Sequence, residues 1–190
     1  MAEQSFHQNG IIPDLIRDLP LYLDLLEVKY LSNVEARLGN ELKPRQVQLE
    51  PQLNWNADPQ EFYTVILADP DIPSREDPKE KDFKHWLVIN IPGHDVKQGQ
   101  AMTEYVGSAP PEKTGLHRYV FLVYRQGGTL AICEEHIDSK TLQGRPKWNV
   151  QKFADDYQLG PPVAGNFFVA EWDDYVPEVY KNIKSQCTIA

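Results

Sequence analysis

The chain has 190 residues, of which 41% are hydrophobic and 15 are proline, and its formal net charge is −9. This length suits one domain with a core of ordinary size, and so many prolines favour strands and loops over long helices. The acidic balance excludes a general nucleic-acid binder and adsorption to anionic membranes, which both need clustered basic residues.

The sequence also indicates where the protein resides. No apolar run approaches the length of a membrane span, and the N-terminus lacks the pattern of a signal peptide. The two cysteines, Cys133 and Cys187, lie far apart in the sequence, as expected for free thiols in a reducing compartment. We therefore expect a cytoplasmic protein.

The first third of the chain predicts short elements. We expect residues 1–12 to be a mobile lead-in and residues 13–190 to form a single domain. A short helical turn is expected at 13–18, where a proline stands early and an acid near the start. Strands are predicted at 25–31 and 34–38, and a proline-interrupted edge segment at 47–55.

The stretch from Tyr63 to His85 organises the rest of the chain. It begins as a strand dense in β-branched residues, with Tyr63, Val65, Leu67 and Asp69 on one face and Phe62, Thr64, Ile66 and Ala68 on the other. Two prolines, Pro70 and Pro73, then end the strand, because each lacks a backbone donor. A second strand opens at His85. We therefore expect Asp69 and His85 to meet at one rim of a sheet.

The remaining elements follow in order. A strand is predicted at 85–91 and a last strand within 163–172, and the strongest apolar run, 120–124, predicts a buried strand. Residues 134–150 are polar and irregular, 150–157 has weak helical spacing, and 177–184 predicts a short helix with Val179, Tyr180 and Ile183 on one face. Many short strands and no β-α-β alternation indicate an all-β sandwich or barrel.

The residues most suited to chemistry stand at the predicted strand ends. His85 and His117 each begin an apolar strand, with Tyr119 close in sequence to His117. If these three side chains converge with Asp69, the imidazoles and the phenol can hydrogen-bond an anion, while Asp69 orients a histidine or pairs with a ligand ammonium group. The backbone around Gly107 can add N–H donors. Such a site suits a phosphate monoester or diester.

Other interpretations remain open at this point. Both histidines can be structural groups with satisfied hydrogen bonds, and Asp69 can simply cap its own loop. A zinc site of Asp69, His85 and His117 lacks the usual ligand spacing. A serine hydrolase using Ser74 or Ser108 lacks the G-x-S-x-G motif.

Three segments resemble the signatures of the phosphatidylethanolamine-binding protein family. They are the stretch 63–74 followed after ten residues by His85, the segment 105–111 followed by 115–119, and the segments 162–165 and 170–177. The resemblance covers nearly the whole chain from about Pro13 onward. It is strongest toward the animal branch, which includes the Raf kinase inhibitor protein, and two long motifs in the right order are specific.

The resemblance implies a mainly β fold: a Greek-key sandwich of two antiparallel sheets with short C-terminal helices. It also implies a cis peptide bond between Ile72 and Pro73, and a small anion pocket for phosphate-type groups such as the phosphoethanolamine head group. Tyr180 is a lid residue and Phe83 an aromatic wall in that pocket. The implied ligand-binding residues are Asp69, Pro73, Phe83, His85, Gly107, Pro111, His117, Tyr119 and Tyr180.

The family also implies a function. We expect a monomeric, non-enzymatic binding protein, without cofactor or metal and without stable membrane insertion, that modulates a kinase partner. The alternative is a protease-inhibitor or protein-interaction module in which the pocket is incidental. Two positions depart from the family pattern. Phe83 replaces the tryptophan of the mammalian form, and Lys152 replaces the serine through which mammalian Raf kinase inhibitor proteins are switched by phosphorylation.

Overall fold

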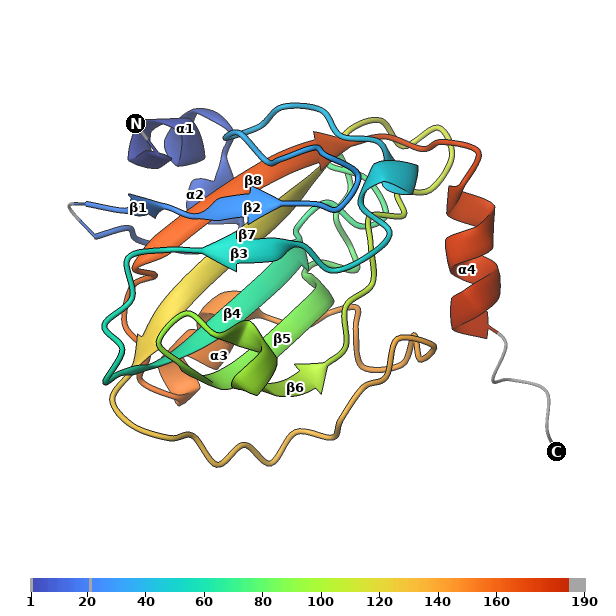
Figure 1. Ribbon diagram of the computed structural model, residues 1–190. Helices are drawn as coiled ribbons and strands as arrows, with labels where there is room; N and C mark the ends of the chain where they lie inside the picture. Colours follow the sequence, from blue (N-terminus) through green and yellow to red (C-terminus); the bar gives the residue numbers. More distant parts are fainter. Residues whose placement is uncertain (1, 21, 185–190) are drawn as a thin grey trace, which may run out of the picture.

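The computed structural model describes residues 2–20 and 22–184 of the chain (Figure 1). Cys133 is a free, exposed thiol, and Cys187 lies outside the described residues. The helices are α1 (Ala2–Gln8), α2 (Ile11–Asp14), α3 (Val150–Asp156) and α4 (Val176–Lys184), with 3₁₀ turns η1 (Pro44–Gln46) and η2 (Val96–Gln98). The strands are β1 (Asp24–Leu25), β2 (Glu27–Lys29), β3 (Gln52–Asn54), β4 (Phe62–Asp69), β5 (Phe83–Pro92), β6 (Gln100–Thr103), β7 (His117–Gln126) and β8 (Ala164–Ala170).

A six-stranded sheet in the order β1-β8-β7-β4-β5-β6 forms the centre of the molecule. The predicted central strand is β4, and its two faces are both buried. Ile66 and Ala68 pack into one hydrophobic cluster, and Val65 and Leu67 pack into a second one on the other side. The predicted division of this strand into two faces is confirmed, and the burial of both faces explains its nearly continuous apolar sequence.

The two faces of the large sheet are covered differently. The small sheet of β2 and β3 covers one face, which we name the small-sheet face, and α1, α2 and α3 cover the other, the helix face. Figure 1 shows β2 and β3 in front of the large sheet and α3 behind it. The prediction of a mainly β fold is confirmed. The expected pair of antiparallel sheets is not, because β1 pairs in parallel with β8 and makes the large sheet mixed.

Two predicted strands are shorter or missing. The segment expected at 25–31 contains only the three residues of β2 and the last residue of β1. The strand expected at 34–38 is replaced by a single bridge between Glu35 and Lys29. Asn33 and Leu38 both have positive φ angles, a conformation that cannot continue a regular strand.

The N-terminal segment differs from the expected mobile lead-in. Residues 2–8 form α1, and the side chain of Phe6 is fully buried. Its ring lies edge-on to Phe167, with centroids 5.6 Å apart, and covers Gly165, where an added Cβ would lie 2.9 Å from the Phe6 ring. The sequence of this segment has no long apolar periodicity, and tertiary packing stabilises the short helix instead.

Helix α4 lies at the side of the sheet (Figure 1). Val179 and Ile183 pack with Val106, as expected for the apolar face of this helix. Across residues 2–20 and 22–184, none of the helices has both the length and the apolar character needed to cross a membrane.

The buried position of Phe6 generates a prediction. Phe6→Ala should lower the free energy of unfolding by about 3 kcal/mol or more, the usual cost of a cavity the size of a phenylalanine side chain. Urea denaturation followed by circular dichroism measures this loss. Gln8→Ala, at an exposed position of the same helix, is the control and should change stability little. Equal stability of both variants would mean that α1 is not part of the core.

Candidate functional site

Three strand ends meet at one edge of the large sheet. β4 ends at Asp69, which pairs with Phe83 at the start of β5. β7 begins at His117, and its residue Val120 pairs with Ala68. Antiparallel neighbours bring the end of one strand to the start of the next, so the predicted meeting at one rim is confirmed.

A β-bulge aims His85 into this edge. Trp86 pairs with Leu67 and Lys84 pairs with Ala68, so His85 is an extra residue opposite two consecutive residues of β4. On a regular strand His85 and Trp86 would point to opposite faces. The bulge instead brings the His85 ring to Tyr119, at a centroid distance of 5.2 Å. We name Asp69, His85, His117 and Tyr119 the histidine cluster.

His117 connects two partners across the cluster. Its Nδ1 lies 2.9 Å from Asp69 Oδ2, and its Nε2 lies 2.8 Å from Thr114 Oγ1. The single hydroxyl proton of Thr114 is donated to the carbonyl oxygen of Pro111, at 2.7 Å. Nε2 must therefore donate to Thr114. The His117–Asp69 pair thus shares one further proton on the Nδ1 side, and its net charge is zero.

Asp69 is fully buried, and burial raises the pKa of its carboxyl above the usual value, against the lowering effect of His117. Its second oxygen accepts a hydrogen bond from the Asp71 backbone N–H at 2.7 Å. The sequence-based alternative that Asp69 caps its loop is therefore correct as well, since one carboxyl group both caps the loop and orients His117.

His85 has a different protonation state from the one the sequence argument assumed. Its Nδ1 lies 2.9 Å from the carbonyl oxygen of Val106, which can only accept, so Nδ1 carries the proton. The pKa of His85 is lowered to about 3, mainly by burial, and the nearby Arg145 guanidinium contributes in the same direction. The ring is therefore neutral near pH ~7, and Nε2 is a hydrogen-bond acceptor. The assumption that both imidazoles donate to an anion is wrong for His85.

Arg145 holds the bulged strand in place. It is fully buried and donates to five backbone carbonyls, among them those of Lys84 and His85 at 3.1 and 3.2 Å. The other three belong to Thr141, Glu104 and Asp138. Nothing in the sequence distinguishes this arginine from a surface residue of a polar loop, so sequence reasoning missed it.

Three buried polar groups in this region have no hydrogen-bond partner: His85 Nε2, Tyr119 Oη and Ser108 Oγ. The Tyr119 ring stacks on Phe168 at 5.1 Å, and burial keeps its hydroxyl protonated by raising the pKa well above the usual value. Ser108 follows the Val106 and Gly107 residues that contact His85 and Val47. Buried polar groups without partners are uncommon in folded proteins, so these three atoms call for an explanation.

The other expected site residues border the histidine cluster in different ways. Phe83 is half-buried, with its ring 4.6 Å from that of His85. Tyr180 on α4 donates its hydroxyl to the Ala109 carbonyl at 2.7 Å. Pro111 accepts from Thr114, and Pro73 follows the cis bond to Ile72, as expected, in the loop after β4.

Gly107 has a packing reason of its own. A Cβ at this position would lie 2.5 Å from the Val47 carbonyl oxygen, so only glycine fits here. From the sequence we expect the backbone around this glycine to offer N–H donors to a ligand. In the structure it is the approach of the 106–108 segment to Val47 that excludes a side chain.

Two alternatives from the sequence can be compared with this geometry. Across residues 2–20 and 22–184, no three His, Cys, Asp or Glu side chains are placed to hold a metal ion, so Asp69, His85 and His117 do not form the considered zinc site. A serine nucleophile requires a hydrogen bond to a base, and Ser108 has none among the described residues. Thr114, His117 and Asp69 line up like a catalytic triad, but Nε2 donates to Thr114 and cannot take its proton.

Comparisons with known proteins agree with one another. A family model described as phosphatidylethanolamine-binding protein matches residues 32–168. The Drosophila melanogaster protein named "Putative odorant-binding protein A5" is 40% identical over 173 residues, 91% of this chain and 81% of that protein. The solution structure of CG7054 has a TM-score of 0.73 and 40% identity, covering 91% of this chain and 97% of that one. A carboxypeptidase Y inhibitor, crystallised with its cognate proteinase, has a TM-score of 0.76 and 28% identity, covering 90% and 95%.

The Tyr119 hydroxyl generates a prediction for the free protein. Because this buried group has no partner, Tyr119→Phe should leave the free energy of unfolding unchanged or raise it by about 1 kcal/mol. The control is Tyr63→Phe, which removes the acceptor of the Asp58 N–H, at 2.9 Å, and should lower stability by about 1 kcal/mol. Urea denaturation compares the two variants. A clear loss of stability in Tyr119→Phe would show that the hydroxyl is satisfied in the free protein.

Proposed function

Because the chain belongs to the phosphatidylethanolamine-binding protein family, we propose that it is a non-enzymatic binding protein for small phosphate-type ligands such as the phosphoethanolamine head group. The ligand would lie on the histidine cluster. The observation that carries this proposal is the set of three buried polar groups without partners, His85 Nε2, Tyr119 Oη and Ser108 Oγ.

The hydrogen-bonding pattern defines what such a ligand must present. The hydroxyls of Tyr119 and Ser108 can donate to phosphate oxygens, whereas Nε2 of His85 accepts. A phosphate monoester with one remaining proton satisfies both requirements, as does phosphoethanolamine through its ammonium group. A fully ionised phosphate would place an oxygen lone pair against that of Nε2. The proposed ligand is therefore a monoanion or a zwitterion.

Access to the histidine cluster would involve α4. The Tyr180 hydroxyl donates to Ala109, and this residue adjoins Ser108. In the proposal Tyr180 is the lid residue, Phe83 is the wall, and Pro73, Gly107 and Pro111 belong to the loops of the pocket. Movement of Tyr180 would exchange this side-chain hydrogen bond for one to water or ligand.

A protein partner belongs to the proposal as well. We propose a kinase partner in signalling. A protease is the alternative, because a 28% identical structure is a carboxypeptidase Y inhibitor in complex with its proteinase. Lys152 is exposed on α3 and pairs with Asp156, and it has no hydroxyl to phosphorylate. Modulation of a partner would therefore not use a phosphoserine at this position. We propose further that the protein is monomeric and cytoplasmic and uses no cofactor.

The proposed site is tested by titrating isotope-labelled protein with O-phosphoethanolamine and recording backbone amide shifts. Saturable shifts confined to His85 and to residues 106–119 support the proposal. Shifts elsewhere, or none at millimolar ligand, would mean that the partnerless groups do not form a phosphate site.

A matched pair of variants gives the affinity prediction. Tyr119→Phe should weaken phosphoethanolamine binding by about tenfold, the scale of one lost hydrogen bond to a charged group. Tyr63→Phe lies on the same sheet face but away from the histidine cluster and should bind as the unaltered chain does. Isothermal titration calorimetry measures both. Equal affinities in the two variants would contradict the assigned role of Tyr119.

The proton on the ligand gives a pH prediction. A phosphate monoester loses its last proton near pH ~6. Because His85 is already neutral well above its pKa of about 3, only the ligand can supply that proton to Nε2. Methyl phosphate should therefore bind at least about tenfold more weakly at pH ~7.5 than at pH ~5.5. Phosphoethanolamine keeps its ammonium proton and should lose less. Identical profiles for the two ligands would argue against His85 as the acceptor.

A further inference from the structure

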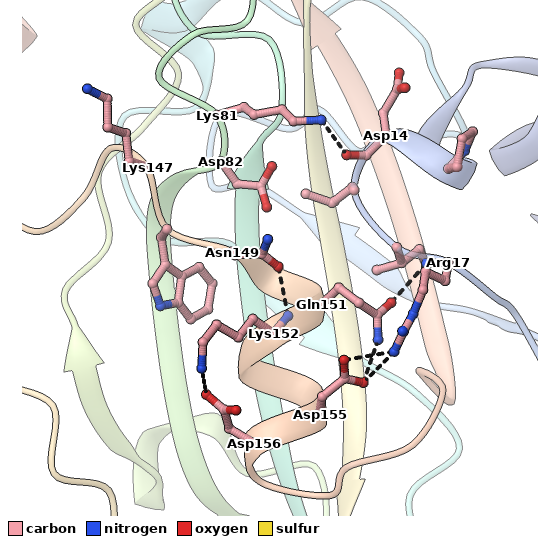
Figure 2. Close-up of a pocket in the computed structure, with 14 residues that line it drawn as sticks. Asp14, Arg17, Lys81, Asp82, Lys147, Asn149, Gln151, Lys152, Asp155 and Asp156 are labelled. Carbon is pink, nitrogen blue, oxygen red and sulfur yellow. Dashed lines mark hydrogen bonds and ion pairs between the residues drawn. The ribbon is translucent and has the colours of Figure 1, made fainter.

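A cavity of about 540 Å³ opens on the helix face of the large sheet. Its walls are residues 13–17 at the end of α2, the turn of Lys81 and Asp82 before β5, and residues 147–156, which include α3. Its volume is within the usual range for small-molecule sites. We name it the Asp82 cavity, because Figure 2 shows the Asp82 carboxylate facing its middle.

The charged groups at the edge of the Asp82 cavity are almost all paired with one another. Arg17 contacts Asp155 at 2.7 Å, and Lys152 pairs with Asp156 one turn along α3. Lys147 contacts Glu80 at 3.1 Å, and Asp14 contacts Arg118 at 2.9 Å. These pairs neutralise most of the charge on the rim.

Lys81 and Asp82 are left without a partner of opposite charge. Within the described part of the chain, neither makes an ion pair. The Lys81 ammonium donates to the backbone carbonyl of Asp14 at 3.3 Å, at an exposed position. Asp82 is 5% exposed, and its Oδ2 accepts the Val150 N–H at 3.1 Å. Among the described residues this is the one hydrogen bond recorded for the carboxylate, which faces the cavity (Figure 2).

The electrostatic surroundings agree with this geometry. The pKa of Asp82 is raised to about 6, mainly by burial, and the charges of Asp69 and Asp71 contribute in the same direction. The Val150 N–H and the Lys81 charge lower it without balancing the burial. Asp82 is thus a buried carboxylate short of positive charge. A cation brought by a ligand would supply what the protein does not.

We propose that the Asp82 cavity binds the ammonium group of a small organic amine, which donates hydrogen bonds to the Asp82 carboxylate. The side chains of Leu15, Ile16 and Trp148 line the same cavity and provide apolar contact for a short carbon chain. The phosphate site proposed above lies on the small-sheet face of the large sheet, whereas this cavity opens on the helix face. The two sites can therefore be tested independently.

The proposal is tested with n-propylammonium chloride as the probe and n-propanol as its neutral counterpart. Isotope-labelled protein at pH ~7.5 is titrated with each, and the amide signals of Trp148 and Val150 are followed. Propylammonium should give saturable shifts and propanol none of comparable size. Equal responses, or no saturable shift up to about 50 mM, a range that covers the weakest specific sites, would overturn the proposal.

Asp82→Asn is the central variant, because asparagine keeps the shape and an oxygen acceptor for the Val150 N–H but removes the charge. It should weaken propylammonium binding by at least about tenfold. Asp156→Asn, exposed on the rim, is the matched control and should bind normally. Methyl phosphate carries no ammonium group, and its binding at pH ~5.5 should stay unchanged in both variants. Unaltered propylammonium affinity in Asp82→Asn would overturn the proposal.

The unaltered chain provides a second measurement, should Asp82→Asn fail to fold. Asp82 is charged above its pKa of about 6 and neutral below it. Propylammonium affinity should therefore be present at pH ~7.5 and fall by at least about tenfold toward pH ~5 as the carboxylate is protonated. An affinity that is the same at both pH values would contradict the assignment to Asp82.

Discussion

A buried guanidinium–carboxylate pair, Arg118 with Asp71, determines how the loop after β4 lies against β7. The two side chains are 2% and 1% exposed, and two bonds of 2.9 and 2.5 Å join the guanidinium to the two carboxylate oxygens. The same carboxylate accepts the Arg118 backbone N–H at 2.8 Å. Since Arg118 stands between His117 and Tyr119, alternation along the strand directs those two side chains to the other face. Removing either partner would leave a buried charge, so the loop that follows Asp69 has little freedom.

A second buried arginine, Arg145, fixes the start of β5 through hydrogen bonds, as Arg118 fixes the start of β7. Arg145 has no carboxylate partner among its hydrogen bonds and is held by five backbone carbonyls, two of them at the bulge that presents His85. A cation surrounded by carbonyl dipoles keeps its hydrogen bonds while staying buried, and its charge helps to keep His85 neutral. The polar segment around it is therefore ordered by one side chain rather than by regular secondary structure.

These constraints give the histidine cluster a hydrogen-bonding pattern rather than a net charge. The proton shared between Asp69 and His117 leaves that pair without net charge, and the neutral His85 accepts a hydrogen bond instead of donating one. Ligand choice at such a site depends on matching donors with acceptors, since a mismatch leaves buried groups unpaired. The Asp82 cavity has the opposite character, because one incompletely paired carboxylate dominates it.

Much of this protein can be predicted from its sequence because local patterns determine it. The two faces of β4, the turn at the prolines and the strand starts at His85 and His117 follow from residue type and spacing. Other features depend on contacts between distant residues. The burial of Phe6 requires Gly165, the direction of His85 requires a bulge opposite Leu67, and its neutral ring requires the Val106 carbonyl. Sequence alone therefore determined which groups gather at this edge of the sheet. Only the tertiary structure decided their directions and protonation, because both depend on burial and on partners far away in the chain.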